Sequence, residues 1–185
     1  EKLREYRWKA ILDLGIDEKN LKWKKHKNLV FYAKEAYDIE YNFPWGFDEI
    51  EGVHARGDYD LTQHSKGSGK QLDYLDQESG EKFIPHIIES SGGVERLFFA
   101  IMTEAYTEDE LGGETRVFLK FKPSLAPVKV AVFPLLKNKP ELVDKAREIF
   151  EALKKEIKPI VFDDNGNIGK RYRRQDEIGT PYCVT

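Results

Sequence analysis

Cysteine, long apolar runs and an excess of charge of either sign are scarce or absent in this 185-residue sequence. The single cysteine, Cys183, excludes an internal disulfide and any site built from several thiolates. No run of about 18 apolar residues occurs and Glu1–Glu5 lacks the apolar stretch of a signal peptide, so we expect a soluble, cytoplasmic protein with no membrane segment. The formal charge of −3 argues against a general nucleic-acid coat but leaves room for a local basic patch.

Apolar residues are numerous enough for a packed core, at 40% hydrophobic and 12% aromatic, and the length fits one domain or two small ones. In the first half, alternating apolar residues predict strands, and apolar residues three or four apart predict helices. The strands are expected at Ala36–Phe43, Glu49–Val53, Phe83–Ile88 and Thr115–Phe121, and the helices at Arg4–Leu14 and Val94–Tyr106. This half is therefore predicted to be α+β, with antiparallel strands packed on helices.

The pattern changes at Pro123 and Pro127, and we place a domain boundary near Pro123, which gives domains at 1–123 and 124–185. The second part has the order strand, helix, strand, turn, helix, strand, typical of a small open α/β domain. Its elements are expected at Val128–Leu136, Glu141–Lys155, Pro159–Phe162, Lys170–Glu177 and Tyr182–Val184. Because the last predicted strand begins so near the final residue, we expect the chain to be an excerpt from a longer polypeptide.

Three stretches resemble ligand-binding motifs but fail in detail. Ser68–Lys70 lacks the flanking glycine and hydroxyl residue of a phosphate loop, and Asp163–Asn167 lacks the glycine and distal glutamate of a calcium loop. The histidine and aspartate residues of His54–His64 do not have the tight spacing of a zinc site, so polar loop residues are the favoured interpretation.

The most informative stretch is Ile87–Arg96, where a predicted strand runs through Gly92 and Gly93 into the amphipathic helix. Two glycines at this point let the backbone approach a flat or phosphorylated ligand. Arg96 then lies in the first helical turn, where the helix dipole disfavours a cation unless an anion is near. A glycine-rich turn followed by a surface arginine is the alternative that the pattern alone leaves open.

These residues resemble motif 3 of class II aminoacyl-tRNA synthetases, and in detail they resemble glycyl-tRNA synthetases of the homodimeric type. That family typically has Glu-Pro-Ser-x-Gly-x-Asp-Arg here, and this chain has Ser90 in place of the proline and Glu95 in place of the aspartate. Other stretches that match are Tyr32–Lys34, Glu49–Val53, Arg56–Leu61, Leu125–Lys129, Gly166–Tyr172 and Asp176–Pro181. The resemblance runs from about Leu29 to Thr185, through part of a catalytic domain with an antiparallel sheet and part of an anticodon-binding domain.

The resemblance implies an ATP site at Glu49, Ile50, Gly93 and Arg96. Arg96 is expected to be catalytic, pairing its guanidinium with phosphate charge and stacking on adenine. Glu49 is the second catalytic candidate, since its carboxylate could hold the Mg²⁺ ion that bridges the phosphates. The expected cofactors are therefore ATP and Mg²⁺.

The resemblance also implies a glycine site at Glu89, Ser91, Gly92 and Gly93. Glu89 and Ser91 would receive the substrate ammonium, which needs acceptors and charge compensation. Gly92 and Gly93 would line a pocket that rejects larger amino acids by steric clash. The implied reaction is attack of the glycine carboxylate on the α-phosphate of ATP, followed by transfer of glycyl to the terminal ribose of tRNA.

Residues 126–185 resemble the start of the anticodon-binding domain that several class II synthetases share. Their basic cluster consists of Lys170, Arg171, Arg173 and Arg174. Contact with the RNA backbone is one interpretation, and a helix surface balanced by acidic neighbours is the other. The basic stretch Lys22–Lys27 allows the same two interpretations. The expected partners are tRNA(Gly), glycine, ATP and, in the complete enzyme, a second copy in a homodimer.

Motif 1, which forms the dimer interface in this family, and motif 2, which grips the α-phosphate, are not found, so these residues alone are expected to be inactive. One alternative is a non-catalytic nucleic-acid-binding protein on the same fold, like the synthetase-like accessory subunit of the mitochondrial DNA polymerase. Another is the histidine, threonine or proline enzyme of the same class. Retention of Glu49, Glu89, Ser91 and Arg96 favours the ligase over the first, and Glu-x-Ser before the glycines argues against the second.

Overall fold

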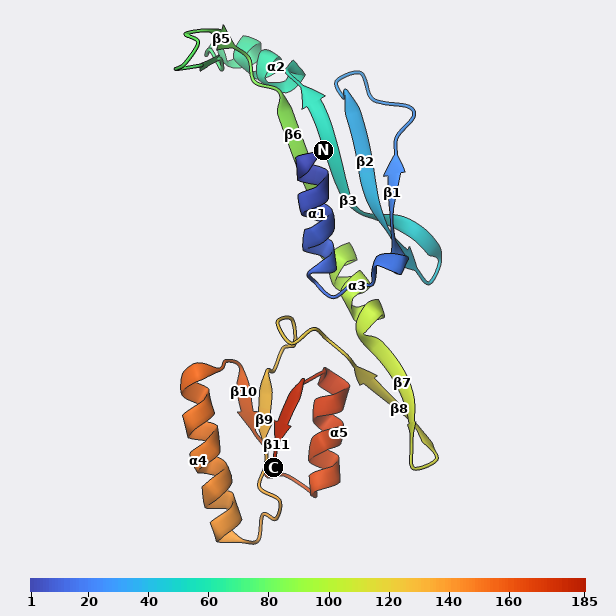
Figure 1. Ribbon diagram of the computed structural model, residues 1–185, viewed down its shortest axis with the longest axis vertical. Coiled ribbons are helices and arrows are strands. Elements are labelled where there is room, and N and C mark those ends of the chain that lie inside the picture. The colour runs from blue at the N-terminus through green and yellow to red at the C-terminus, as the bar shows by residue number, and fades with distance from the viewer. The chain divides into compact units, whose positions relative to one another are not determined.

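The computed structural model describes residues 1–185 and divides into two compact units, Glu1–Ala100 and Ile101–Thr185 (Figure 1). The division falls inside helix α3 (Val94–Ala105). The domain boundary predicted near Pro123 rests on sequence punctuation rather than on compactness, and it stays a prediction. No helix in the structure has both the length and the apolar character needed to cross a membrane.

The N-terminal unit is built on a four-stranded antiparallel sheet with the order β1-β2-β3-β6 (Figure 1). Its strands are β1 (Leu21–Lys25), β2 (Glu35–Phe43), β3 (Gly46–Gly57) and β6 (Ile87–Gly92). β2 and β3 are joined by a tight turn that ends at Gly46, whose φ of +107° suits a residue without a side chain. The register between these strands shifts at Ile39 and Glu40, because Glu51 and Glu49 are their partners and Ile50 lies between the two pairs.

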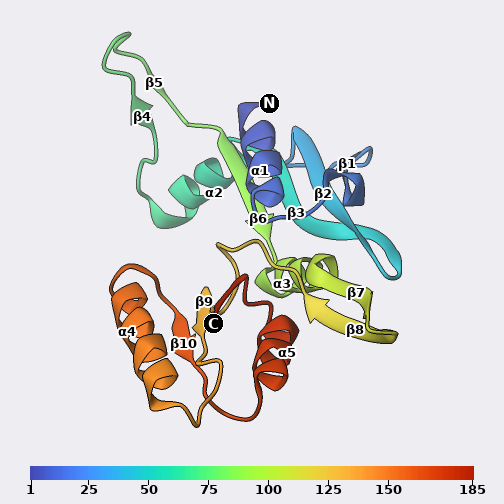
Figure 2. The same cartoon turned by 60° about the horizontal axis from the view of Figure 1, so that its bottom comes forward.

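Helices and short elements surround this sheet. They are α1 (Lys2–Leu12), the 3₁₀ helix Glu18–Asn20, α2 (Tyr59–Ser68), β4 (Tyr74–Leu75), β5 (Lys82–Phe83) and α3. Helix α1 lies against one face, with the Arg4 guanidinium 3.9 Å from the centroid of the Tyr37 ring. The β4–β5 hairpin projects away from the sheet (Figure 2).

The C-terminal unit combines a hairpin with a three-stranded parallel sheet of order β10-β9-β11. Its elements are β7 (Tyr106–Leu111), β8 (Glu114–Leu119), β9 (Val130–Val132), α4 (Pro140–Glu156), β10 (Ile160–Phe162), α5 (Ile168–Ile178) and β11 (Tyr182–Val184). Val130 and Val132 face α4 through Ala146, whereas Phe133 packs its ring against Tyr172 of α5 at 5.2 Å between centroids. The two helices therefore cover opposite faces of the parallel sheet.

Most predicted elements are confirmed, including the antiparallel sheet and the α/β order of the second part. Three predicted strands are wrong in extent. The stretch Glu49–Val53 is only the middle of β3. Pro85 divides the stretch Phe83–Ile88, so that β5 and β6 lie on either side of it. The apolar run Val128–Leu136 forms a strand only at Val130–Val132. Five elements were not predicted, namely the 3₁₀ helix, β1, α2, β4 and β7.

Candidate active site

Three of the predicted glycine and ATP residues, Glu49, Glu89 and Ser91, lie on one face of the antiparallel sheet. Residues directly opposite each other in neighbouring strands point to the same side. The register pairs His54 with Glu89, Gly52 with Ser91, and Asp38 with Gly52. Past the bulge it pairs Glu40 with Glu49. Glu49, Glu89 and Ser91 therefore share a face with the buried carboxylates of Asp38 and Glu40.

Gly92 lies on the opposite face, because its strand partner is Glu51. A Cβ atom built on Gly92 would lie 3.0 Å from the carbonyl oxygen of Ile50, so this glycine lets β6 approach β3 closely. Gly93 has no such neighbour, since the nearest side-chain atom is Arg96 Cβ at 3.9 Å. The structure thus gives Gly92 a packing reason, and the roles of both glycines in excluding larger substrates stay predictions.

Arg96 reaches back from α3 to the start of β3. Its Nη1 donates to the carbonyl oxygen of Glu49 at 2.6 Å and lies 3.2 Å from Asp48 Oδ1. The main-chain N–H of Glu49 and then the Arg96 charge lower the pKa of the Asp48 carboxyl. The Glu49 carboxylate is exposed and Ile50 is buried, so of the predicted ATP residues Glu49 and Arg96 offer side-chain groups to a ligand.

Glu89 is held from one side only. Its Oε2 accepts a hydrogen bond from Arg56 Nη1 at 2.7 Å, whereas Oε1 accepts none. His54 Nδ1 lies 3.7 Å from Oε1, which exceeds hydrogen-bond length. The second ring nitrogen of His54, Nε2, is buried without a hydrogen-bond partner. The sequence places Arg56 in a matching stretch, Arg56–Leu61, but gives it no role, because nothing local to that stretch indicates the contact with Glu89.

Two buried carboxylates on this face were also missed. Asp38 bonds to His26 Nε2 at 2.6 Å, and Glu40 pairs with Lys24 at 2.8 Å and Lys22 at 3.1 Å. Burial opposes the charge of Glu40, but the two ammonium groups outweigh it, and the pKa of the Glu40 carboxyl lies below its ordinary value. The basic stretch Lys22–Lys27 thus supplies partners to acids of the neighbouring strand.

The face under α1 has its own polar cluster. Arg7 holds the buried Glu51 carboxylate through two hydrogen bonds of 2.5 and 2.8 Å, and Ser90 donates to it at 2.6 Å. These residues and Gly92 line a cavity of about 380 Å³. The cluster fastens α1 to the sheet on the side away from Glu89 and Ser91.

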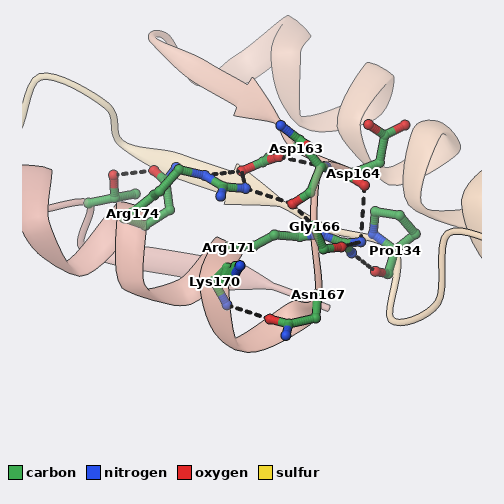
Figure 3. A network of polar contacts seen from close by, with 11 residues as sticks. Pro134, Asp163, Asp164, Gly166, Asn167, Lys170, Arg171 and Arg174 are labelled. Carbon is green, nitrogen blue, oxygen red and sulfur yellow. Dashed lines mark hydrogen bonds and ion pairs between the residues drawn. The ribbon is translucent and has the colours of Figure 1, made fainter.

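The basic residues predicted to contact RNA lie on α5. Figure 3 shows the contacts of three of them, Lys170, Arg171 and Arg174. Arg171 is only 1% exposed. Its guanidinium donates to the main-chain oxygens of Pro134, Asp164 at 3.1 Å and Gly166 at 2.7 Å. Arg171 therefore supports the turn before α5 and presents no donor at the surface. The sequence had placed it in the basic cluster that could contact RNA.

The other three basic residues keep surface access. Arg173 pairs with Glu177 one turn later at 2.9 Å, and Arg174 pairs with Asp163 at 2.5 Å. Burial opposes the charge of Asp163, but hydrogen bonds from Arg174 and from the N–H of Asn165 lower the pKa of its carboxyl. The Lys170 ammonium makes no ion pair and is exposed. Lys170, Arg173 and Arg174 remain the part of the cluster that RNA could reach.

Comparison with known proteins finds similarity over nearly the whole chain. Residues 129–185 match the family model described as the anticodon binding domain. A glycine–tRNA ligase of Chlorobaculum tepidum is 49% identical over 180 residues, which cover 97% of this chain. Those of Clostridium acetobutylicum and Borrelia garinii subsp. bavariensis are 47% and 52% identical over 98% and 95% of the chain. The chain is homologous to glycine–tRNA ligases.

The chain spans about two-fifths of the length of these ligases, with shares of 38%, 39% and 40%. The similarity to the ligases extends through the antiparallel sheet as well as the anticodon binding domain, because it covers nearly all of the chain. The residues around Glu89 and Arg96 therefore lie within the similar segment.

Proposed function

We propose that this chain acts as part of a glycine–tRNA ligase, which forms glycyl-adenylate from glycine and ATP and transfers glycyl to tRNA. The observation that carries the proposal is the similarity to glycine–tRNA ligases over 97% of the chain. In this proposal the antiparallel sheet belongs to a class II catalytic domain, and the complete ligase is a cytoplasmic homodimer.

Glycine would be received on the face of the sheet that carries Glu89 and Ser91. The unpaired Oε1 atom of Glu89 supports this assignment, because a substrate ammonium needs an acceptor that is not already occupied. The serine hydroxyl of Ser91, on the same strand and face, supplies a second acceptor.

ATP would bind beside this site, at the exposed Glu49 carboxylate and the Arg96 guanidinium. Arg96 is about half exposed, with 53% of its side chain accessible, so an incoming phosphate could reach it. Mg²⁺ would supply charge neutralisation of the phosphates, with Glu49 as its protein ligand. The C-terminal unit would contact tRNA(Gly), where Lys170, Arg173 and Arg174 meet phosphate charge.

The test is ATP–pyrophosphate exchange by the complete open reading frame that encodes this chain. Arg96→Ala is expected to abolish exchange. Glu89→Gln is expected to raise the Michaelis constant (KM) for glycine at least tenfold, because a charged hydrogen bond contributes about 1.5–3 kcal/mol, and to leave the KM for ATP within about twofold. Glu148→Gln, which alters an exposed pair with Lys145 on α4, is the matched control.

Near-normal exchange by Arg96→Ala would contradict the ATP assignment, and an unchanged glycine KM for Glu89→Gln would contradict the glycine assignment. A non-catalytic accessory protein predicts a different result, namely no glycine-dependent exchange by the unaltered protein. The same assay therefore separates the ligase from its alternative.

A further inference from the structure

Arg56 is the side chain that fixes the position of Glu89. It lies near the end of β3, where the register with β6 shifts between Ala55 and Gly57. Its Nη1 donates to Glu89 Oε2 at 2.7 Å, and its Nε and Nη2 donate to the two oxygens of Asp60 at 2.8 and 3.1 Å. The guanidinium also lies 4.6 Å from the centroid of the Tyr32 ring. Contacts on three sides leave Arg56 little freedom to turn.

This arrangement divides the Glu89 carboxylate into two unequal oxygens. Oε2 is occupied by Arg56, and Oε1 has no hydrogen-bond donor, since His54 Nδ1 stands 3.7 Å away. Glu89, Arg56 and His54 line a cavity of about 280 Å³. The Glu89 side chain therefore borders space that a substrate can enter.

The charges of the cluster also suit a cationic group. Asp60, Arg56 and Glu89 together carry one net negative charge, because one guanidinium stands between two carboxylates. Without Asp60, the Arg56–Glu89 pair would be neutral and would attract an ammonium weakly. Hydrogen bonds to Asp60 and then to Glu89 raise the pKa of Arg56, so its charge is constant over the working pH range.

We propose that Arg56 is a positioning residue for glycine activation: it holds one oxygen of Glu89 so that the other oxygen receives the substrate ammonium. Asp60 supports this arrangement by orienting the guanidinium and by giving the three-residue cluster a net negative charge. The inference rests on the proposed function, since it assigns Glu89 to glycine. Arg56 acts through Glu89 and does not itself touch the substrate.

Two variants of the complete ligase test the role by ATP–pyrophosphate exchange. Arg56→Met removes the fork, so Glu89 is free to turn, and the glycine KM is expected to rise at least tenfold while the ATP KM changes less than about twofold. Arg56→Lys keeps the charge but cannot bridge Glu89 and Asp60 with the same geometry. Its glycine KM is therefore expected to lie between that of the unaltered ligase and that of Arg56→Met. Arg116→Met is the matched control, because Arg116 makes a similar fork with Asp109 in the C-terminal unit.

A double-mutant cycle separates positioning from a general structural effect. If Arg56 acts through Glu89, adding Arg56→Met to Glu89→Gln leaves the glycine KM within about twofold of Glu89→Gln alone. If instead Arg56→Met raised the glycine KM of the Glu89→Gln variant by the same factor as it raises that of the unaltered ligase, the proposal would be overturned. So would a fall in glycine KM for Arg56→Met, since the guanidinium charge would then oppose the ammonium.

Asp60→Asn keeps the proposal testable if Arg56→Met does not fold, because it retains the arginine and loses one charge. Its glycine KM is expected to rise about threefold or more, and an unchanged value would count against the role. Absence of glycine-dependent exchange in the unaltered ligase would refute the proposed function itself. Normal exchange with a glycine KM insensitive to all three substitutions would refute only this inference.

Discussion

Replacing the buried Arg171 by methionine should destabilise the C-terminal unit strongly. Methionine fits the length of the arginine stem but leaves three main-chain carbonyls without donors. The Pro134 contact is buried, and an unsatisfied buried carbonyl costs about 1–3 kcal/mol. The hydrogen bonds to Asp164 and Gly166 are only partly buried, so these carbonyls can recruit water and each lost bond costs about 0.5–1.5 kcal/mol. Relief from burying the guanidinium offsets part of this, and we expect a net loss of about 3 kcal/mol.

The two units can be followed separately in urea, because Trp8, Trp23 and Trp45 all lie in residues 1–100. Tryptophan fluorescence therefore reports the N-terminal unit, and far-ultraviolet circular dichroism adds the helices of the C-terminal unit. With a urea dependence of about 1.5 kcal/mol per molar, a loss of 3 kcal/mol lowers the C-terminal midpoint by about 2 M. The fluorescence midpoint should not move.

Arg173→Met is the control, since Arg173 makes only an exposed pair with Glu177, which contributes about 0.5 kcal/mol or less. A shift below about 0.5 M for Arg171→Met, or equal shifts for the two variants, would refute the view that Arg171 supports the turn before α5.

Two further predictions concern single residues. Gly179→Ala should destabilise the C-terminal unit by about 2–4 kcal/mol, because the left-handed backbone is strained for alanine and the new Cβ would lie 2.8 Å from the Leu119 oxygen. Gly112→Ala is the control, since open space surrounds Gly112, and it should cost only about 1–2 kcal/mol in the same dichroism assay. Glu40 has a pKa depressed below 4.5, so its contribution to stability is present above that pH and is lost as pH falls through the folded value. The urea midpoint measured by fluorescence should therefore decrease as the pH is lowered below about 4.5, and Glu40→Gln should make this decrease smaller. The same decrease in the variant would contradict the Glu40 assignment.

The elements that sequence predicted well are those whose pattern is local. Helices α3 and α4 carry apolar residues every three or four positions, and the alternation of β2 continues through most of its length. In α4 the pattern follows from burial of one face around Ala146. In α3, by contrast, Val94 and Phe98 of the predicted apolar face are 78% and 63% exposed, and β2 is buried on both faces.

The missed elements lack such a pattern or draw their stability from remote residues. Helix α2 has no buried residue, and the Arg56–Asp60 pair ties its first turn to the end of β3. Strand β1 does alternate, with Leu21 and Trp23 facing one side, but its lysines obscured the signal. Their buried partner, Glu40, lies 16 residues from Lys24, so composition alone made the segment look like a solvated or RNA-binding surface.

The candidate site likewise contains residues that the sequence placed and contacts that it could not indicate. The resemblance to glycyl-tRNA synthetases placed Glu89 and Ser91 by motif, and the register confirms only that they share a face with Glu49. The contacts that set the charge and orientation of Glu89 come from Arg56, 33 residues earlier in the chain. No periodicity links two positions so far apart, and their proximity depends on strand pairing.

Arg96 illustrates how a local conflict can have an internal solution. A cation in the first turn of a helix suggested a nearby anion, and the structure supplies one in Asp48, at 3.2 Å. The conflict alone therefore does not require ATP. A bound phosphate would compete with Asp48 for the guanidinium, and Arg96 could serve both only if its Nη1 kept the Glu49 carbonyl while the remaining donors turned outward. The Asp48 carboxylate would then hold Arg96 in place before ATP binds and yield to the more highly charged phosphate on binding.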